Sequence, residues 1–147
     1  MPTRITRFLH ISINPNAETG IGTTYDKTKA HAHDLLDGRP QFKKNNTWRG
    51  YLETINIQTS SWAGGTPPSS IDLMVTADAD GDVILLNSTT ATLEPALTTA
   101  NAGGVSYRVD APLSIVGGNV GDGTIYLHIK TDSGTLTLDG SAVYWSE

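Results

Sequence analysis

The sequence predicts an all-β fold, an antiparallel two-sheet β-sandwich with an irregular basic N-terminal arm or long loop. Three observations support this prediction. Apolar residues alternate with polar ones over several short stretches, which is typical of half-buried strands. Twenty threonines and fifteen glycines suit pleated strand surfaces and the turns between them. Strands do not alternate with helical patterns, so a parallel sheet is not indicated.

The first third of the chain begins with one predicted strand. Residues 4–14 place four apolar side chains on one parity, Ile5, Leu9, Ile11 and Ile13, and Asn14-Pro15 ends the pattern. Residues 15–24 are rich in Gly and Thr and are expected to form a loop.

Residues 25–38 fit two alternatives, which the sequence leaves open. They could form a short helix with Asp26 as its N-cap and Gly38 just past its end. They could equally be extended. Residues 39–47 are polar and are expected to be loop, so the arm or long loop covers 15–47 within one domain of residues 1–147.

Regular alternation starts at Trp48. A strand is predicted to Gln58, with Tyr51, Glu53, Ile55 and Ile57 on one face. Residues 60–70 and 88–104 contain Pro and Gly or are Thr/Ala-rich, and both are expected to be loops. Between them, residues 71–87 predict a hairpin that turns at Asp80-Gly81.

The last third contains short strands at 105–109, 113–116 and 125–130, and a closing hairpin of 136–138 and 142–145 around Asp139-Gly140. The total is eight or nine strands. That number fits a jelly roll, although a strand count does not separate it from an immunoglobulin-like sandwich.

Charge is divided unevenly along the chain. Residues 1–49 hold eight basic and four acidic side chains, a net of +4, while residues 50–147 hold two basic and eleven acidic ones, a net of −9. A β-domain with a basic arm of opposite sign is suited to association, including with a copy of itself. The predicted partner-binding residues of the arm are Arg4, Arg7, Lys27, Lys29, Lys43 and Lys44.

Several classes of function are disfavoured by composition. Without cysteine the chain has no disulfide framework, thiolate metal site or cysteine nucleophile. No apolar run is long enough to span a membrane or to act as a signal peptide. A pI near 5.2 argues against nucleic acid as the main partner, although the basic arm could still touch phosphate.

Two groups of residues are candidate metal sites. Asp78, Asp80 and Asp82 have the spacing of the first calcium-loop ligands. The expected Gly and Glu are replaced by Val83 and Thr89, so a solvated hairpin tip explains the segment. His31 and His33 would share a face of an extended segment, but a third zinc ligand is not evident. We therefore expect solvated loop histidines, no metal and no cofactor. If these histidines lie in an interface, protonation near pH 6 would alter association.

No pattern of catalytic residues is evident. The chain lacks a Gly-x-Ser-x-Gly motif and a phosphate-binding loop, so we expect no enzymatic activity.

Trp62 stands in a Ser/Gly/Pro segment. It is either an anchor for a partner protein or a sugar, or it folds back on its own domain.

Three segments within residues 70–147 carry a resemblance to a known family: Ile71-Asp-Leu-Met-Val-Thr-Ala-Asp, Gly123-Thr-Ile-Tyr-Leu-His-Ile-Lys-Thr-Asp-Ser-Gly-Thr and Ala142-Val-Tyr-Trp. In these segments the second half resembles small jelly-roll virion proteins of bacteriophages, either capsid decoration (cement) proteins or minor capsid proteins. The resemblance implies a non-enzymatic protein that oligomerises, often as a trimer, and bridges capsid subunits. It transfers no functional residues.

The leading hypothesis is therefore a structural virion protein, located in the capsid, whose partners are capsid protein and its own copies. The alternative is a lectin-like or fibre-tip module in which Trp62, Tyr126 or Tyr107 stacks on a sugar. A third hypothesis is a cupin-type enzyme, for which only His128 lies in a predicted strand at a plausible metal-ligand position.

Overall fold

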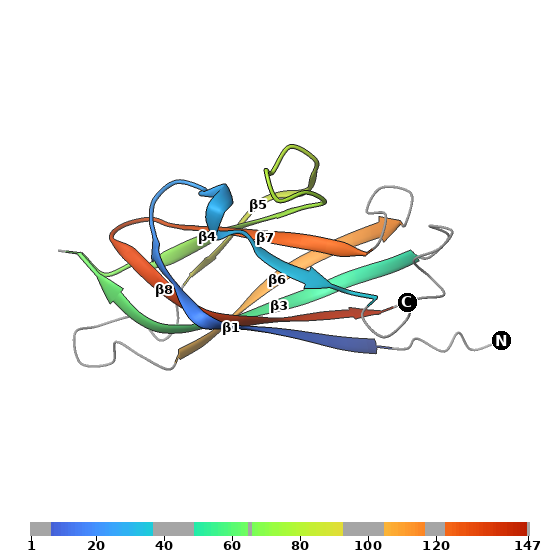
Figure 1. Cartoon of the computed structure of the whole chain (residues 1–147), viewed down its shortest axis with the longest axis horizontal. Helices are drawn as coiled ribbons and strands as arrows, with labels where there is room; N and C mark the ends of the chain where they lie inside the picture. The colour runs from blue at the N-terminus through green and yellow to red at the C-terminus, as the bar shows by residue number, and fades with distance from the viewer. Residues whose placement is uncertain (1–6, 37–48, 65, 93–104, 117–122, 147) are drawn as a thin grey trace.

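The computed structural model describes residues 7–36, 49–64, 66–92, 105–116 and 123–146. Within these ranges the chain forms eight strands and one three-residue 3-10 helix, η1 (Lys27–Lys29). The strands are β1 (Arg7–Ile21), β2 (His31–Asp34), β3 (Arg49–Ala63), β4 (Ser70–Thr76), β5 (Ile84–Thr92), β6 (Val105–Val116), β7 (Thr124–Thr131) and β8 (Thr135–Ser146). They pack as two layers (Figure 1).

The strand order identifies the sandwich as a jelly roll. One sheet has the order β1-β8-β3-β6 and the other β2-β7-β4-β5. Strands pair antiparallel as β1 with β8, β2 with β7, β3 with β6 and β4 with β5. This nested pairing is that of one long hairpin wound into two sheets. The predicted fold class is confirmed, and the pairing settles the choice that a strand count left open.

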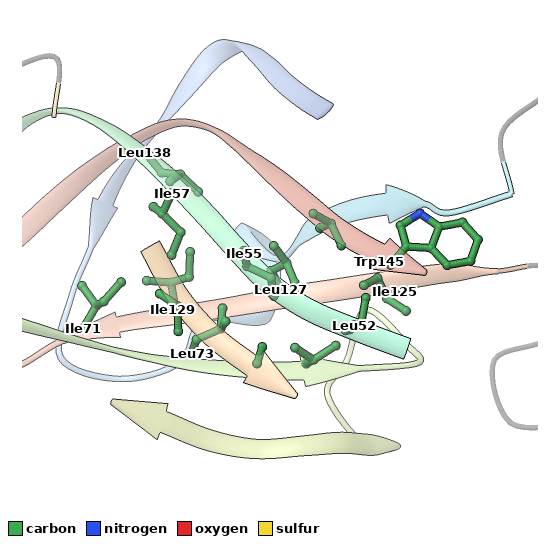
Figure 2. Packing of buried hydrophobic residues seen from close by; sticks show 14 of the residues in the cluster. Leu52, Ile55, Ile57, Ile71, Leu73, Ile125, Leu127, Ile129, Leu138 and Trp145 are labelled. Atoms are coloured by element: carbon green, nitrogen blue, oxygen red, sulfur yellow. The ribbon is translucent and has the colours of Figure 1, made fainter. Parts of the chain in front are cut away.

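The space between the sheets holds the hydrophobic core. In β4 and β7 the alternation predicted from sequence is observed, with Ile71, Leu73, Ile125 and Leu127 fully or almost fully buried. Trp145 closes one end of this core (Figure 2). These side chains are removed from water on folding, and the burial of each contributes roughly 1.5–3 kcal/mol to the free energy of unfolding.

A β-bulge in β3 changes which parity faces the core. The register of β3 shifts between Leu52 and Thr54 against both neighbours, β6 and β8. Leu52 is buried before the bulge, and Ile55 and Ile57 are buried after it. The sequence prediction that Tyr51 and Glu53 share a face with Ile55 is therefore wrong, because an extra residue reverses the alternation.

A second bulge replaces the predicted closing hairpin. β8 runs through Asp139-Gly140 as one strand, and its register with β3 passes from Gln58↔Gly140 to Thr59↔Leu138. Leu138 is buried before this point, and Ser141 and Val143 after it. An Asp-Gly pair usually indicates a turn. Here it forms a bulge, because β1 and β3 continue to pair with β8 on both sides.

The N-terminal segments are more regular than the sequence indicated. β1 continues past Pro15 to Ile21, with register shifts on either side of Glu18. The loop prediction for residues 15–21 is therefore wrong. Asp26 caps η1 as predicted, since its Oδ1 accepts the Thr28 N–H at 2.9 Å. The chain then extends into β2, so both alternatives for this segment were partly right.

Three further expectations change along the chain. β3 reaches Ala63 and β5 reaches Thr92, so the loops predicted from residues 60 and 88 begin later. The two strands predicted in 105–116 are the single strand β6. Pro112 is tolerated there because β6 is an edge strand, where a missing N–H leaves no ladder partner unpaired. The hairpin of β4 and β5 is confirmed, with Gly81 at a φ of 80° in its turn.

Candidate functional site

The outer surface of the β1-β8-β3-β6 sheet carries a group of exposed large side chains. Leu9, Tyr51 and Tyr144 are 49%, 41% and 38% exposed. Leu9 lies directly opposite Tyr144 in the β1–β8 ladder, a spacing at which cross-strand side chains interact. We call these three residues the tyrosine face. Single exposed apolar residues are ordinary, so it is the grouping of these three on one sheet that makes the face a candidate interaction surface.

Both tyrosines line a shallow hollow of about 680 Å³ on this sheet. The other lining residues are Glu53, Thr54, Asn56, Arg108, Asp110 and Pro112. Arg108 Nε lies 3.4 Å from Asp110 Oδ1, and both side chains are largely exposed. The hollow thus combines two aromatic rings with hydrogen-bonding groups of both charges, which suits a protein surface or a saccharide.

The bulges explain why the tyrosines point outward. Tyr51 precedes the β3 bulge and alternates with buried Leu52, while Tyr144 lies between buried Val143 and Trp145. Sequence reasoning missed this face because it placed Tyr51 in an uninterrupted alternating strand and Tyr144 in the second strand of a closing hairpin. The available signal was the odd spacing of the large apolar residues Leu52 and Ile55.

A second hollow, of about 440 Å³, lies outside the other sheet near His128. His128, Met74 and Thr76 alternate with core residues and so project outward from β7 and β4. They are nevertheless buried. Residues of the β1–β2 connection and of the β4–β5 turn line the hollow beside them, and Lys27 Nζ approaches Asp80 Oδ1 at 3.7 Å across it.

His128 is held in one tautomer by its partners. The Thr76 hydroxyl donates to the Asp78 carbonyl at 2.6 Å, so the 2.9 Å contact with His128 requires His128 Nε2–H to be the donor. Burial lowers the pKa of His128, and the carbonyl and charge of Asp78 only partly oppose this effect. The folded protein therefore favours the neutral ring of His128. His128 is the one histidine among the residues that line this hollow.

Asp78, Asp80 and Asp82 gather at the β4–β5 turn, with one carboxylate oxygen from each within 4.8 Å of the others. Asp78 is occupied by the turn itself, because it accepts the N–H groups of Val83 at 2.9 Å and Asp82 at 3.2 Å. The Val83 N–H is the main cause that lowers the pKa of Asp78. These contacts agree with the hairpin tip expected from sequence.

His31 and His33 are not solvated loop histidines. Both are buried side chains of β2 that project between the sheets. Their ring nitrogens, Nδ1 of His31 and Nε2 of His33, lie 2.6 Å and 2.5 Å from the hydroxyl oxygen of Ser141. The signal available in the sequence was the alternation of His31, Ala32 and His33. It does not look like a half-buried strand, because its inward-facing residues are polar histidines. Among the described side chains, Asp78, Asp80 and Asp82 form the one group with three closely spaced ligands.

The structure places three of the six predicted partner-binding residues of the arm, namely Arg7, Lys27 and Lys29. Lys27 is exposed and pairs with Asp80, and Lys29 donates to the Gly20 carbonyl at 2.9 Å. Arg7 begins β1 opposite Ser146, and its side chain is outside the described part. Arg4, Lys43 and Lys44 lie outside the described residues, as does Trp48.

The aromatic candidates also take new positions. Trp62 is in β3, opposite Leu136, and its half-buried ring packs against the core. This is the arrangement of the alternative in which the ring folds back on its own domain. Tyr126 is half-buried in β7 opposite Ala32, and Tyr107 lies in β6 opposite Ile57.

Comparison with known proteins gives few likenesses. No protein-family model and no curated protein matches the chain. Among solved structures it is similar to a protein of the T13 IBDV viral particle, with 11% identity and a TM-score of 0.43 over 97% of this chain. The chain spans only 31% of that protein. It is also similar to the tobacco streak virus coat protein, with 11% identity and a TM-score of 0.41 over 100% of this chain and 88% of that one.

Both TM-scores lie below the range of chains that share a fold. The jelly-roll assignment therefore rests on the strand pairing. Within the described residues, no helix is both long and apolar enough to cross a bilayer.

Proposed function

We propose that this chain is a non-enzymatic structural protein of a virus particle that associates through the tyrosine face. Jelly rolls are the scaffold of viral capsid domains, lectins and cupins, so the fold limits the choices without deciding among them. The observation that carries the proposal is the exposure of Leu9, Tyr51 and Tyr144 on the outer side of this sheet. A sheet face that groups exposed aromatic side chains supports docking.

The proposed occupant of this face is a second copy of the chain. The hollow beside the tyrosines contains two carboxylates, Glu53 and Asp110, and one basic group, Arg108, which pairs with Asp110. Its net charge is therefore negative, while residues 1–49 carry a net charge of +4. Opposite charges steer association and fix its register. A trimer is the expected assembly, built into a capsid alongside capsid protein, and the specific role is that of a phage decoration (cement) or minor capsid protein.

The mass of the purified protein, measured by light scattering over a salt series, tests this proposal. We expect an oligomer that weakens as salt increases, because exposed charges are screened beyond about 8–10 Å at physiological ionic strength. A monomer at every salt concentration and at high protein concentration would overturn it.

A carbohydrate-binding module is the second candidate, and the composition of the hollow favours it. Tyr51 and Tyr144 stand beside Asn56, Arg108 and Asp110, and aromatic rings with nearby polar groups are suited to sugar rings. A glycan array separates the two candidates. Binding that Tyr144→Ala abolishes and Trp62→Ala leaves intact would support a sugar site here, whereas an empty array would remove this candidate.

A further inference from the structure

Two imidazoles and one hydroxyl meet in the interior of the sandwich. His31 is 6% exposed, His33 is fully buried and Ser141 is 5% exposed. The Ser141 oxygen lies 2.5 Å from His33 Nε2 and 2.6 Å from His31 Nδ1. The rings pack edge to face with centroids 5.3 Å apart. We call these three residues the histidine latch.

The latch joins the two sheets. His31 and His33 belong to β2, where they lie opposite the core residues Leu127 and Ile125. Ser141 belongs to β8, in the other sheet, and faces inward only because the Asp139-Gly140 bulge reverses the alternation. β2 has four residues and, among the described strands, pairs only with β7. β2 therefore depends on the histidine latch more than β8 does, because β8 pairs with β1 and β3.

The proton count of the latch depends on pH. A serine hydroxyl has one proton, so Ser141 donates to one imidazole and accepts an N–H from the other. This arrangement requires at least one imidazole to be neutral at the nitrogen that faces Ser141. When both rings are protonated, both nitrogens that face Ser141 carry N–H donors, so the Ser141 hydroxyl can donate its proton to neither ring. Two positive charges then also lie close together inside the sandwich, which is unfavourable.

Other ionisable groups lie on the described strands that pack around the latch. Tyr126, His128 and Lys130 of β7 alternate with the core residues and project to the opposite side of their sheet. The remaining ionisable residues of these strands are Asp34 of β2, Asp139 and Tyr144 of β8, Arg49, Tyr51 and Glu53 of β3, and Arg7, His10 and Glu18 of β1. In the β1–β8 ladder, Ser12 lies opposite Ser141 and His10 lies opposite Val143. Asp34 Oδ1 accepts the Leu36 N–H at 3.1 Å.

We propose that the histidine latch is an acid-sensitive connection that holds β2 against β8 at neutral pH and releases β2 when both imidazoles are protonated. Exposed imidazoles take up protons near pH 6.5, so release begins below about that value. The opened strand binds more protons than the closed one. Its population therefore rises about tenfold per pH unit for each proton taken up. This inference is independent of the proposed function.

Hydrogen exchange of the β2 peptide, residues 31–36, measures the release directly. Rates are corrected for intrinsic exchange and compared at pH 7.5 and pH 5. We expect β2 to lose at least about tenfold in protection at pH 5, while β3 in the centre of its sheet retains its protection. Equal corrected protection of β2 at both pH values would overturn the proposal.

Variants assign the effect to the latch. His33→Gln keeps a hydrogen-bonding side chain that does not titrate in this range, so its β2 protection is expected to be independent of pH. His128→Gln is the matched control, because it removes a buried histidine outside the sheet and should leave the pH response of β2 unchanged. The proposal is wrong if His128→Gln, and not His33→Gln, abolishes the response.

A measurement on the unaltered protein covers the case in which His33→Gln does not fold. Imidazole resonances followed by NMR should show His31 and His33 titrating as a coupled pair in two steps. Independent single-step titration of both rings, with β2 unchanged, would contradict the latch.

Discussion

At the scale of single residues, Gly50 allows Trp145 to close the core. A Cβ atom at residue 50 would lie 3.0 Å from Cε3 and 3.1 Å from Cζ3 of the indole, and the indole is fully buried. The ring cannot move without disturbing its neighbours, because protein interiors are densely packed. The absence of a side chain at this position is therefore a packing requirement.

Gly50→Ala should lower the free energy of unfolding by about 1–3 kcal/mol, since overpacking forces shifts in the core. Gly22→Ala is the matched control, because its Cβ would have only the Gly20 carbonyl oxygen at 4.0 Å. That variant should be unchanged or more stable by about 0.4–1 kcal/mol, since alanine restricts the unfolded chain. Urea denaturation of both proteins measures the difference, and equal effects would contradict this view of Trp145.

Asp139 is the residue whose insertion reverses β8. Deleting it would restore simple alternation and turn Val143 and Trp145 away from the core, at a cost of about 1.5–3 kcal/mol for each. Asp139→Ala, which keeps the residue count, should change stability by no more than about 0.5 kcal/mol. Denaturation curves in which the deletion is as mild as the substitution would show that the bulge does not set the register.

At the scale of elements, the sequence predicted strands well where alternation was uninterrupted. β4 and β7 have buried faces and nearly the predicted bounds, because Ile, Leu and Val occupy every second position. β3 and β8 were predicted with the wrong face or the wrong shape. A bulge is fixed by the partner strands on both sides, and those partners are not visible in the local sequence.

The candidate site was less predictable than the fold for the same reason. Tyr51 and Tyr144 face outward only because of the parity changes in their strands. The buried histidines of β2 depend on a serine more than one hundred residues away. Local composition indicated solvated loop histidines, and tertiary packing determined the outcome.

The outer side of the β2-β7-β4-β5 sheet should contribute a separate pH dependence through His128. Burial lowers the pKa of this histidine, so the unfolded chain takes up its proton at a higher pH than the folded one does. Stability from this group is complete above about pH 6.5 and is lost as the pH falls below that value. His128→Gln should therefore lose less stability than the unaltered protein between pH 7 and pH 5. Identical pH profiles would contradict the assignment.

At the scale of the whole molecule, charge and shape point to association. The basic first third and the acidic remainder have opposite signs, and the tyrosine face lies on the sheet that contains β1. If the basic segment of each copy contacts the tyrosine face of the next copy, the same contact repeats around a closed ring of copies. The two features together predict a salt-dependent oligomer in which the tyrosines form the apolar centre.

The dissociation constant of the oligomer, measured by sedimentation for the unaltered protein and two variants, tests this account most directly. Tyr51→Ser with Tyr144→Ser should weaken assembly by at least about tenfold, since interface aromatic residues often contribute more than about 1–2 kcal/mol. Tyr126→Ser, a matched change on the outer side of the other sheet, should leave it unchanged. If the double variant assembles as well as the unaltered protein, or Tyr126→Ser is the one that dissociates, the tyrosine face is not the docking surface.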